Sequence, residues 1–220
     1  MLALLFASGA SLALIAGRIL WTGRLTYLFL VWNLFLAWLP LVFALLACDE
    51  YRRGEQRTWH FRALAITWLL FFPNAPYIFT DLIHLTSSLY LHFWVDMVLI
   101  LLCAVVGLVL GFVSLFLMQT VVVQMLGRVA SWLFIAAVAG ASGFGIYLGR
   151  FLRFNTWDVL CQPMALCRGI GRWAVSDPAV HPTAFAFPVL FATFLFLAYV
   201  MLYGLTHLQP ALPAPARVEP

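Results

Sequence analysis

The strongest constraint on this chain is a series of long apolar runs, separated by short charged or turn-rich segments. A transmembrane α-helix needs roughly 20 such residues to cross a bilayer core of about 30 Å. Hydrophobic residues make up 65% of the 220 residues, and charged residues make up only 9%. A soluble domain carries about a quarter charged residues, so no soluble core of this size would cover the apolar surface. The sequence therefore predicts an all-α, polytopic membrane helix bundle.

The apolar runs give about six spans in one integral membrane domain, residues 1–208. The expected spans are 2–20, 25–47, 63–80, 93–120, 129–149 and 183–205. No basic region precedes the first run, so we expect a retained span and not a cleaved signal peptide. The fourth run continues to Val123. It exceeds the bilayer core at about 1.5 Å per residue and must tilt or emerge early. The tail, 209–220, is rich in Pro and Ala, and we expect it to be disordered.

An even number of spans places both termini on one side of the membrane. Face A is defined here as the side of the termini and of loops 48–62 and 124–128, and face B as the side of loops 18–24, 81–92 and 150–182. Each face carries six arginines and the chain has no lysine, so the positive-inside rule gives a tie. Setting aside Arg150 and Arg153 as functional residues favours cytoplasmic termini in a cell-membrane protein. Arginines at span ends suit contact with membrane lipids, and they form no patch for nucleic acid.

Polar residues within or beside the apolar runs converge on face B. Such residues are costly in lipid and usually face protein or water. Asn33 lies about 12 Å into the second span, and Asn74 and Asp96 lie close to the face B ends of the third and fourth. The ends and loops on this face add Asp81, His84, His92, Arg150, Arg153, Asn155, Asp158 and His181. We therefore expect spans three and five to end at a shared polar face.

Two acid–histidine pairs flank the connection between spans three and four. Asp81 and His84 are three residues apart, and His92 and Asp96 are four apart, so each pair shares a helix face. Two imidazoles and two carboxylates suit a divalent metal such as zinc. Asp81, His84 and Asp96 are then candidate catalytic residues, because a metal or a metal-free His–Asp pair can activate water. The structural alternative is that Asp81 caps a helix and the histidines lie among lipid headgroups.

Two prolines, Pro73 and Pro76, interrupt span three and remove two backbone donors. Broken helices at membrane depth often line binding cavities. The alternative is a plain proline kink, in which Asn74 satisfies one of the freed carbonyl groups. The pairs Gly107–Gly111 and Gly145–Gly149 have the spacing of closely packed membrane helices.

Arg150 and Arg153 follow span five and are three residues apart, so on a helix they share a face. Such a pair can clamp a phosphate or carboxylate, because the guanidinium group is a planar fork of donors. The alternative is a structural network with Asp81, Asp96 or Asp158, since charges within a membrane normally pair. Cys161 and Cys167 lie in the same loop and would form a disulfide in an oxidising compartment.

Three segments carry a family resemblance: Trp32–Pro40, Phe72–His84 and Gly149–Asp158. Together they resemble the bacterial multi-pass membrane family catalogued as domain of unknown function 1361, over roughly spans two to six. The resemblance implies a bacterial inner-membrane protein and no particular activity. The family's motif residues are matched here by Asn33, Asn74, Asp81, His84, Arg150, Arg153, Asn155 and Asp158.

Three functions are compatible with these residues. The first is binding or transport of a small anionic solute or lipid headgroup, with Asn33, Asn74, Arg150, Arg153, Asn155 and Asp158 as ligand-binding residues. The second is a membrane-embedded hydrolase or transferase that depends on a metal or on a His–Asp pair. The third is an assembly factor whose polar network is purely structural. P-loop, G-x-S-x-G and H-E-x-x-H motifs are absent from the sequence, which disfavours the corresponding enzymes.

Overall fold

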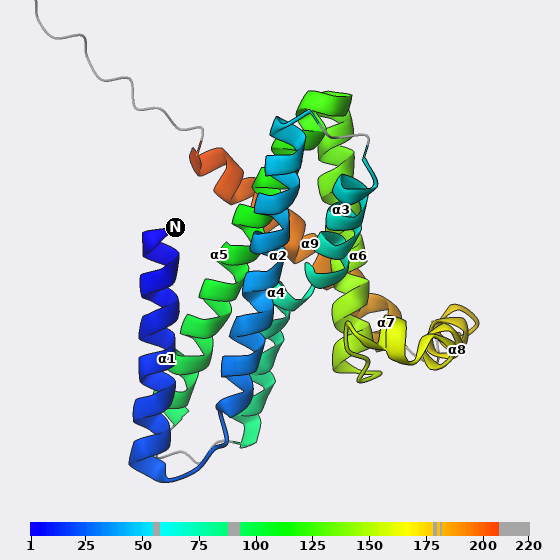
Figure 1. The fold of residues 1–220 in the computed structure, drawn as a ribbon. Coiled ribbons are helices and arrows are strands. Elements are labelled where there is room, and N and C mark those ends of the chain that lie inside the picture. Colours follow the sequence, from blue (N-terminus) through cyan, green and yellow to red (C-terminus); the bar gives the residue numbers. More distant parts are fainter. Residues whose placement is uncertain (55–57, 88–92, 178–179, 181, 207–220) are drawn as a thin grey trace, which may run out of the picture.

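The computed structural model describes residues 1–54, 58–87, 93–177, 180 and 182–206, and every secondary-structure element in these ranges is a helix (Figure 1). In chain order the elements are α1 (Leu2–Thr22), α2 (Leu28–Arg52), α3 (Trp59–Phe71), α4 (Asn74–Tyr77), the 3₁₀-helix η1 (Ile78–Ser87), α5 (Phe93–Leu126), α6 (Arg128–Arg150), α7 (Asp158–Cys161), α8 (Pro163–Ala174) and α9 (Pro182–Thr206). The tail 209–220, His92 and His181 lie outside the described residues.

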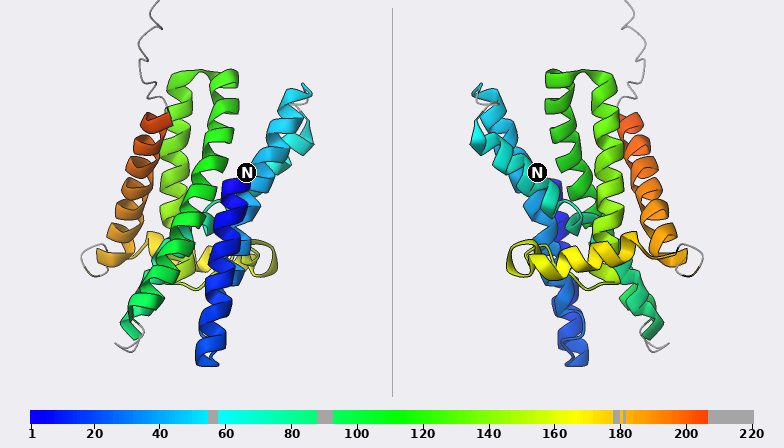
Figure 2. Two further views of the ribbon diagram at one scale, coloured as in Figure 1. Left: turned by 90° about the vertical axis from the view of Figure 1, so that its left-hand side faces the viewer. Right: turned by 90° about the vertical axis from the view of Figure 1, so that its right-hand side faces the viewer.

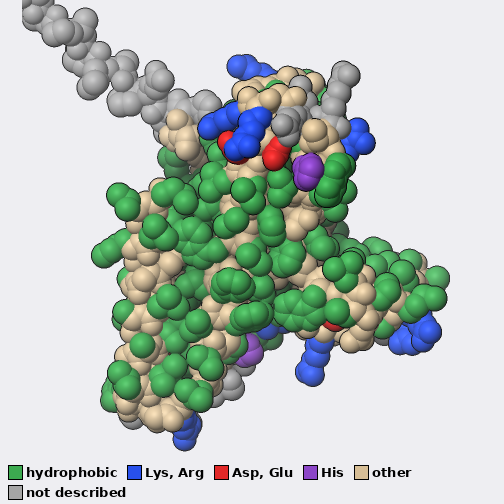
Figure 3. Space-filling view, in the orientation of Figure 1, with side chains coloured by type: hydrophobic (Ala, Val, Ile, Leu, Met, Phe, Trp, Pro, Cys, Tyr) green, Lys and Arg blue, Asp and Glu red, His purple; other side chains and the backbone are tan. Residues whose placement is uncertain are grey.

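Six helical segments of the described chain are long and apolar enough to cross a membrane. Five of them are α1, α2, α5, α6 and α9, and the sixth runs through α3, α4 and η1 as Trp59–Leu85. Figure 3 shows hydrophobic side chains over the middle of the molecule, with arginine and acidic side chains gathered at its upper end. The expected helix bundle with six spans is confirmed, and the chain is a multi-pass membrane protein.

Local sequence signals set several helix ends. Gly23 ends α1 in the left-handed conformation, with φ 63°, and its N–H donates to Ile19 O at 2.7 Å, the geometry of a glycine C-cap. Thr58 begins α3, because its side-chain oxygen accepts from Phe61 N at 3.3 Å. Gly127, with φ 87°, separates α5 from α6. Residues 124–126 therefore belong to α5, where we expected a loop.

Helix α5 is the central element of the bundle. Its 34 residues correspond to about 51 Å at about 1.5 Å per residue, well beyond the apolar core of a bilayer. Figure 2 shows α5 running obliquely through the full height of the molecule, which is the tilt that its length requires. It contacts α1, α2, α4, η1 and α6, while α9 packs against α6.

The segment that follows α6 on face B contains two helices, where we expected a loop over 150–182. Helix α8 lies across the direction of the spans (Figure 2). Leu166, Ile170 and Trp173 recur at helical spacing and are half-buried, so α8 has one apolar side that packs against the protein. Pro163 occupies the start of α8, where its missing N–H costs nothing.

Candidate functional site

The broken part of span three positions the polar residues of the site. Helix α3 ends at Phe71, and the chain continues through α4 into η1. The Asn74 side chain donates from Nδ2 to Phe71 O at 2.9 Å and to Thr156 Oγ1 at 3.0 Å. Asn74 therefore satisfies a carbonyl group at the break, as expected, and also ties the break to the segment after α6.

Two glycine pairs hold α4 between α5 and α6. A Cβ atom on Gly107 would lie 2.7 Å from Ala75 O, and one on Gly111 would lie 3.1 Å from Ala75 Cβ. On the other side, a Cβ on Gly145 would lie 3.1 Å from Pro73 Cγ, and one on Gly149 would lie 3.1 Å from the Tyr77 ring. The close helix packing predicted from the glycine spacing is confirmed, and it fixes the position of the break.

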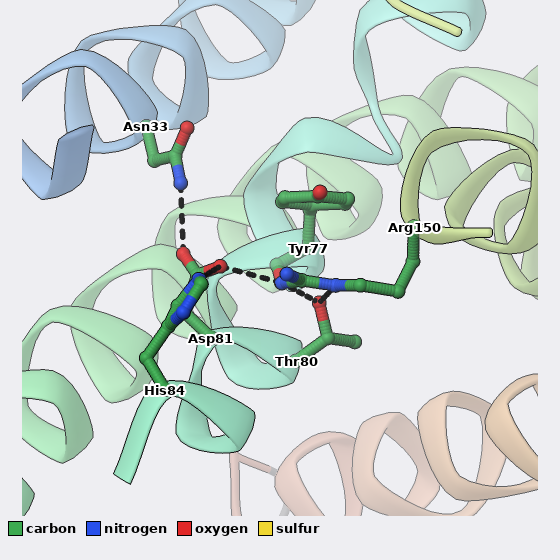
Figure 4. Close-up of polar contacts among 6 residues, drawn as sticks. All are labelled: Asn33, Tyr77, Thr80, Asp81, His84 and Arg150. Atoms are coloured by element: carbon green, nitrogen blue, oxygen red, sulfur yellow. Dashed lines mark hydrogen bonds and ion pairs between the residues drawn. The ribbon is translucent and has the colours of Figure 1, made fainter. Parts of the chain in front are cut away.

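Asp81 is the centre of a buried polar network that joins α2, η1 and α6 (Figure 4). Its side chain is 2% exposed. Oδ1 accepts from Arg150 Nη2 at 2.5 Å, and Oδ2 accepts from Asn33 Nδ2 at 2.8 Å. Arg150 also donates to Thr80 Oγ1 from Nε at 3.0 Å and from Nη2 at 2.6 Å. Spans three and five thus end at a shared polar face, and Arg150 is part of a network with Asp81.

The Arg150 guanidinium group is positioned by an aromatic ring as well as by hydrogen bonds. Its Cζ lies 4.6 Å from the centroid of the Tyr77 ring, a cation–π arrangement. Tyr77 is the last residue of α4, and Thr80 and Asp81 follow it in η1, so one stretch of chain supplies three contacts to Arg150. Among the described residues, Arg150 Nη1 has no hydrogen-bond partner, and its two N–H donors remain available.

His84 lies next to Asp81 at the same end of span three. In a 3₁₀-helix, side chains three residues apart lie above one another, and His84 Nε2 is 3.8 Å from Asp81 Oδ1. The His84 side chain is 44% exposed, and its ring packs against Phe29 at a centroid distance of 4.8 Å. The Asp81–His84 pair predicted from spacing is therefore close in space.

The remaining motif residues after span five are placed differently from the expectation. Helix α6 ends at Arg150, and Arg153 is exposed with a left-handed φ of 59°. The two arginines therefore do not share a helix face, because the helix stops before Arg153. Asp158 is buried and its Oδ2 accepts from Asn155 N at 2.7 Å, which holds a local turn. Ligand binding by Arg153, Asn155 and Asp158 stays a prediction.

Asp96 belongs to a separate ion pair on α1 and α5. Arg18 Nε donates to Asp96 Oδ1 at 2.6 Å, and Arg18 Nη2 donates to Oδ2 at 3.2 Å. The side chains of Arg18 and Asp96 are 10% and 3% exposed. The two carboxylates of the expected metal site are thus each bound by an arginine.

The described part of the chain has no group of three His, Cys, Asp or Glu side chains placed to hold a metal ion. Asp81 and Asp96 would each have to leave an arginine partner in order to bind a metal ion. His92 lies outside the described residues. The four-residue site of Asp81, His84, His92 and Asp96, and the catalytic roles of Asp81, His84 and Asp96, stay predictions. Cys161 and Cys167 are both exposed and unbridged.

A cavity of about 660 Å³ opens beside the Asp81 network. Its polar lining comes from face B ends of the spans and the segment after α6: Asn33, Asn74, Asp81, His84, Arg150 and Asn155. Its apolar lining includes Leu36, Ile66, Leu69, Ala141 and Phe144. Ala141 precedes Arg150 by nine residues on α6, which is about 13 Å at about 1.5 Å per residue. The cavity therefore extends from a polar end at face B towards an apolar end at membrane depth.

Sequence reasoning missed Tyr77, Thr80 and Thr156 as members of the site, and it missed Arg18 as the partner of Asp96. Arg18 carried a usable signal, because a charge within an apolar run normally pairs with another. The hydroxyl groups of Thr80 and Thr156 carried none, since threonine is common in membrane helices and also bonds to its own backbone.

Comparisons of the chain with curated proteins and with solved structures gave no match. A family model does match, and it covers residues 32–202. That stretch contains the broken span, the Asp81 network and all the residues that line the cavity beside it, apart from Phe29. The model is described as "Protein of unknown function (DUF1361)", and the chain belongs to this family.

Proposed function

We propose that this protein binds an amphipathic, lipid-like ligand in the cavity beside the Asp81 network. The observation that carries the proposal is the division of the cavity into a polar end at face B and an apolar end at membrane depth. Its volume of about 660 Å³ lies within the range of about 300–1,000 Å³ that is common for small-molecule sites. A ligand with one polar group and one hydrocarbon chain would satisfy both ends.

The charge at the polar end favours a lipid headgroup over a small free anion. Arg150 is already paired with Asp81, so its positive charge is largely compensated. What it still offers is the pair of N–H donors on Nη1, next to the amide groups of Asn33 and Asn74. This set recognises a headgroup by directed hydrogen bonds, while most of the binding free energy would come from burial of the hydrocarbon chain, at about 0.8 kcal/mol per buried CH₂ group.

The test uses a lysophospholipid that carries a photoactivatable group on its acyl chain. After cross-linking to the detergent-purified protein, mass spectrometry identifies the labelled peptides. We expect labels on the cavity-lining parts of α2, α3 and α6. Ala141→Trp fills the apolar end and should abolish most of this labelling, whereas Ala137→Trp, an exposed position one turn away that does not line the cavity, should leave it unchanged. Equal labelling of both variants would contradict the proposal.

A second candidate is hydrolysis or group transfer on such a lipid-linked substrate. It is favoured by the 3.8 Å separation between His84 Nε2 and Asp81 Oδ1, and by the position of both residues on the cavity lining. An imidazole beside a buried carboxylate can serve as a general base towards a water molecule. In that case His84→Gln should abolish turnover of the lysophospholipid while leaving its cross-linking intact. Turnover that persists in His84→Gln would reject this candidate.

A further inference from the structure

A second cavity lies on the other side of Phe154, beneath helix α8. Its volume is about 570 Å³, and Phe154 lines both this cavity and the one beside Asp81. Arg168 and Arg172 of α8 line the second cavity together with Thr183 and the aromatic rings of Tyr147 and Phe151. None of these residues belongs to the site described above.

Helix α8 is held firmly at this position. Trp173 Nε1 donates to Ala184 O at 2.9 Å, and the Trp173 ring stacks on Phe185 with centroids 5.1 Å apart. A Cβ atom on Gly169 would lie 2.9 Å from the Phe154 ring, so α8 also packs closely against the segment after α6. The two arginines, whose side chains are exposed, are therefore carried by a helix that is docked on the protein.

The orientation of α8 suits a helix at the membrane interface. It lies across the direction of the spans, level with the face B ends of α6 and α9 and above the lower ends of α1 and α5 (Figure 2). In Figure 3, the projecting part at the right has hydrophobic side chains on the side that faces the middle of the molecule, and arginine side chains at its tip and lower edge. This distribution suits a helix that lies in the plane of the membrane interface, with its arginines towards the headgroups.

Arg168 and Arg172 have no acidic partner among the described residues. By contrast, the charges of Arg18 and Arg150 are compensated by Asp96 and Asp81. The two residues are four apart on one helix, where like charges repel each other. An anion placed between them would remove that repulsion, and the guanidinium fork matches the geometry of a phosphate group.

We propose that the cavity beneath α8 binds an anionic phospholipid, with its phosphate between Arg168 and Arg172 and its acyl chains extending from the cavity into the surrounding lipid. The hydrocarbon chains explain the position at the interface, and the unpaired charges explain the preference for a negative headgroup. The site is separate from the cavity of the proposed function and does not depend on it.

The test measures binding of phosphatidylglycerol to the full-length protein in detergent by native mass spectrometry. The double variant Arg168→Gln/Arg172→Gln should bind phosphatidylglycerol roughly thirtyfold more weakly than the unmodified protein, given the usual contribution of two basic residues at an anionic surface. Arg62→Gln/Arg128→Gln is the matched control, because it removes two exposed arginines from face A and the same total charge. This control should bind phosphatidylglycerol normally.

Two further measurements identify the ligand class. Phosphatidylcholine, which has no net charge, should bind the unmodified protein much more weakly than phosphatidylglycerol, and soluble glycerol 3-phosphate should not compete. Competition by glycerol 3-phosphate would show that the site takes a soluble phosphate and would overturn the lipid assignment. Equal loss of binding in the two double variants, or no loss in either, would overturn the role of the α8 arginines. The Ala141→Trp variant should retain phosphatidylglycerol at this site, which separates this result from the first cavity.

Discussion

At the scale of single residues, two of the buried carboxylates in the described part of the chain are each compensated by an arginine. Asp81 binds Arg150 and Asn33, and Asp96 binds Arg18. Breaking a buried ion pair by removing one partner leaves an uncompensated charge, which typically costs about 3–5 kcal/mol, whereas neutralising both partners costs much less. An exposed ion pair is worth at most about 1 kcal/mol. This chain contains both buried ion pairs and an exposed ion pair, Asp49–Arg53, so the two costs can be compared.

We therefore predict that Asp81→Asn lowers the free energy of unfolding by about 3–5 kcal/mol, and that Asp81→Asn/Arg150→Gln recovers a large part of this loss. The matched control is Asp49→Asn, which removes the acid of an ion pair with Arg53 whose side chains are 56% and 64% exposed. It should change the free energy of unfolding by less than about 1 kcal/mol. Reversible unfolding by sodium dodecyl sulfate in mixed micelles gives these values. The pairing would be contradicted if the loss of unfolding free energy in Asp81→Asn/Arg150→Gln equalled the sum of the losses in Asp81→Asn and Arg150→Gln.

Spacing in the sequence predicted which polar residues lie near face B, but it did not predict how they pair. Asp81 and His84 are neighbours because local helical geometry brings residues three apart together. The partners of Asp96 and Arg150 come from other spans, 78 and 69 residues away in the chain. Such long-range pairs depend on how each helix is rotated in the bundle, and a single sequence does not contain that information.

At the scale of elements, the break in span three is held in place by the helices on either side of it. The pairs Gly107–Gly111 and Gly145–Gly149 have no side chains, and α4 occupies the space that Cβ atoms would fill. The sequence predicted both the break and the close packing from proline and glycine positions. It did not predict that the two features meet, because each was inferred from a different span.

We predict that Gly107→Ala destabilises the protein by about 1–3 kcal/mol, the usual cost of inserting a methyl group into a packed core. The new Cβ would lie 2.7 Å from the backbone oxygen of Ala75, and a backbone atom in a packed segment has little room to move. Gly140→Ala on α6 is the matched control, because no atom lies within 4 Å of its Cβ position. It should leave stability unchanged or raise it by up to about 1 kcal/mol. Unfolding midpoints in detergent compare the two variants, and equal midpoints would contradict the packing argument.

The segment after α6 shows where element prediction fails. We expected a loop over 150–182, whereas the chain forms α7 and α8 there. The missed signal is the spacing of Leu166, Ile170 and Trp173, which is helical but too short and too often interrupted by glycine to resemble a span. Arg153 was expected to share a helix face with Arg150, and its left-handed φ of 59° instead turns the chain away from α6.

At the scale of the whole molecule, the ion pairs give a structural basis for the expected orientation in the membrane. Arg18 and Arg150 are bound to acids within the protein, so they are weak topology signals. Setting them aside leaves four arginines on face B, Arg24, Arg153, Arg168 and Arg172, against six on face A. On this count, the positive-inside rule predicts that face A, and with it both termini, lies in the cytoplasm.

We predict that Cys161, exposed on face B, reacts with a membrane-impermeant maleimide in intact cells when the other three cysteines are replaced by serine. A second variant carries its single cysteine on face A, introduced by Gln124→Cys next to the α5–α6 turn, where the side chain is exposed. This variant should react only after the membrane is permeabilised. The reverse pattern of labelling would show that face A is the outer face.

The pairing of buried charges also determines how the protein responds to an electric field. Among the described residues of the spans, Arg18 and Asp96 cancel each other, as do Arg150 and Asp81. The transmembrane voltage does work of about 2.3 kcal/mol per unit charge moved across 100 mV, but a neutral pair that moves as a unit carries almost no charge through the field. Neither of these two pairs therefore supplies a charge on which a change in transmembrane voltage would act.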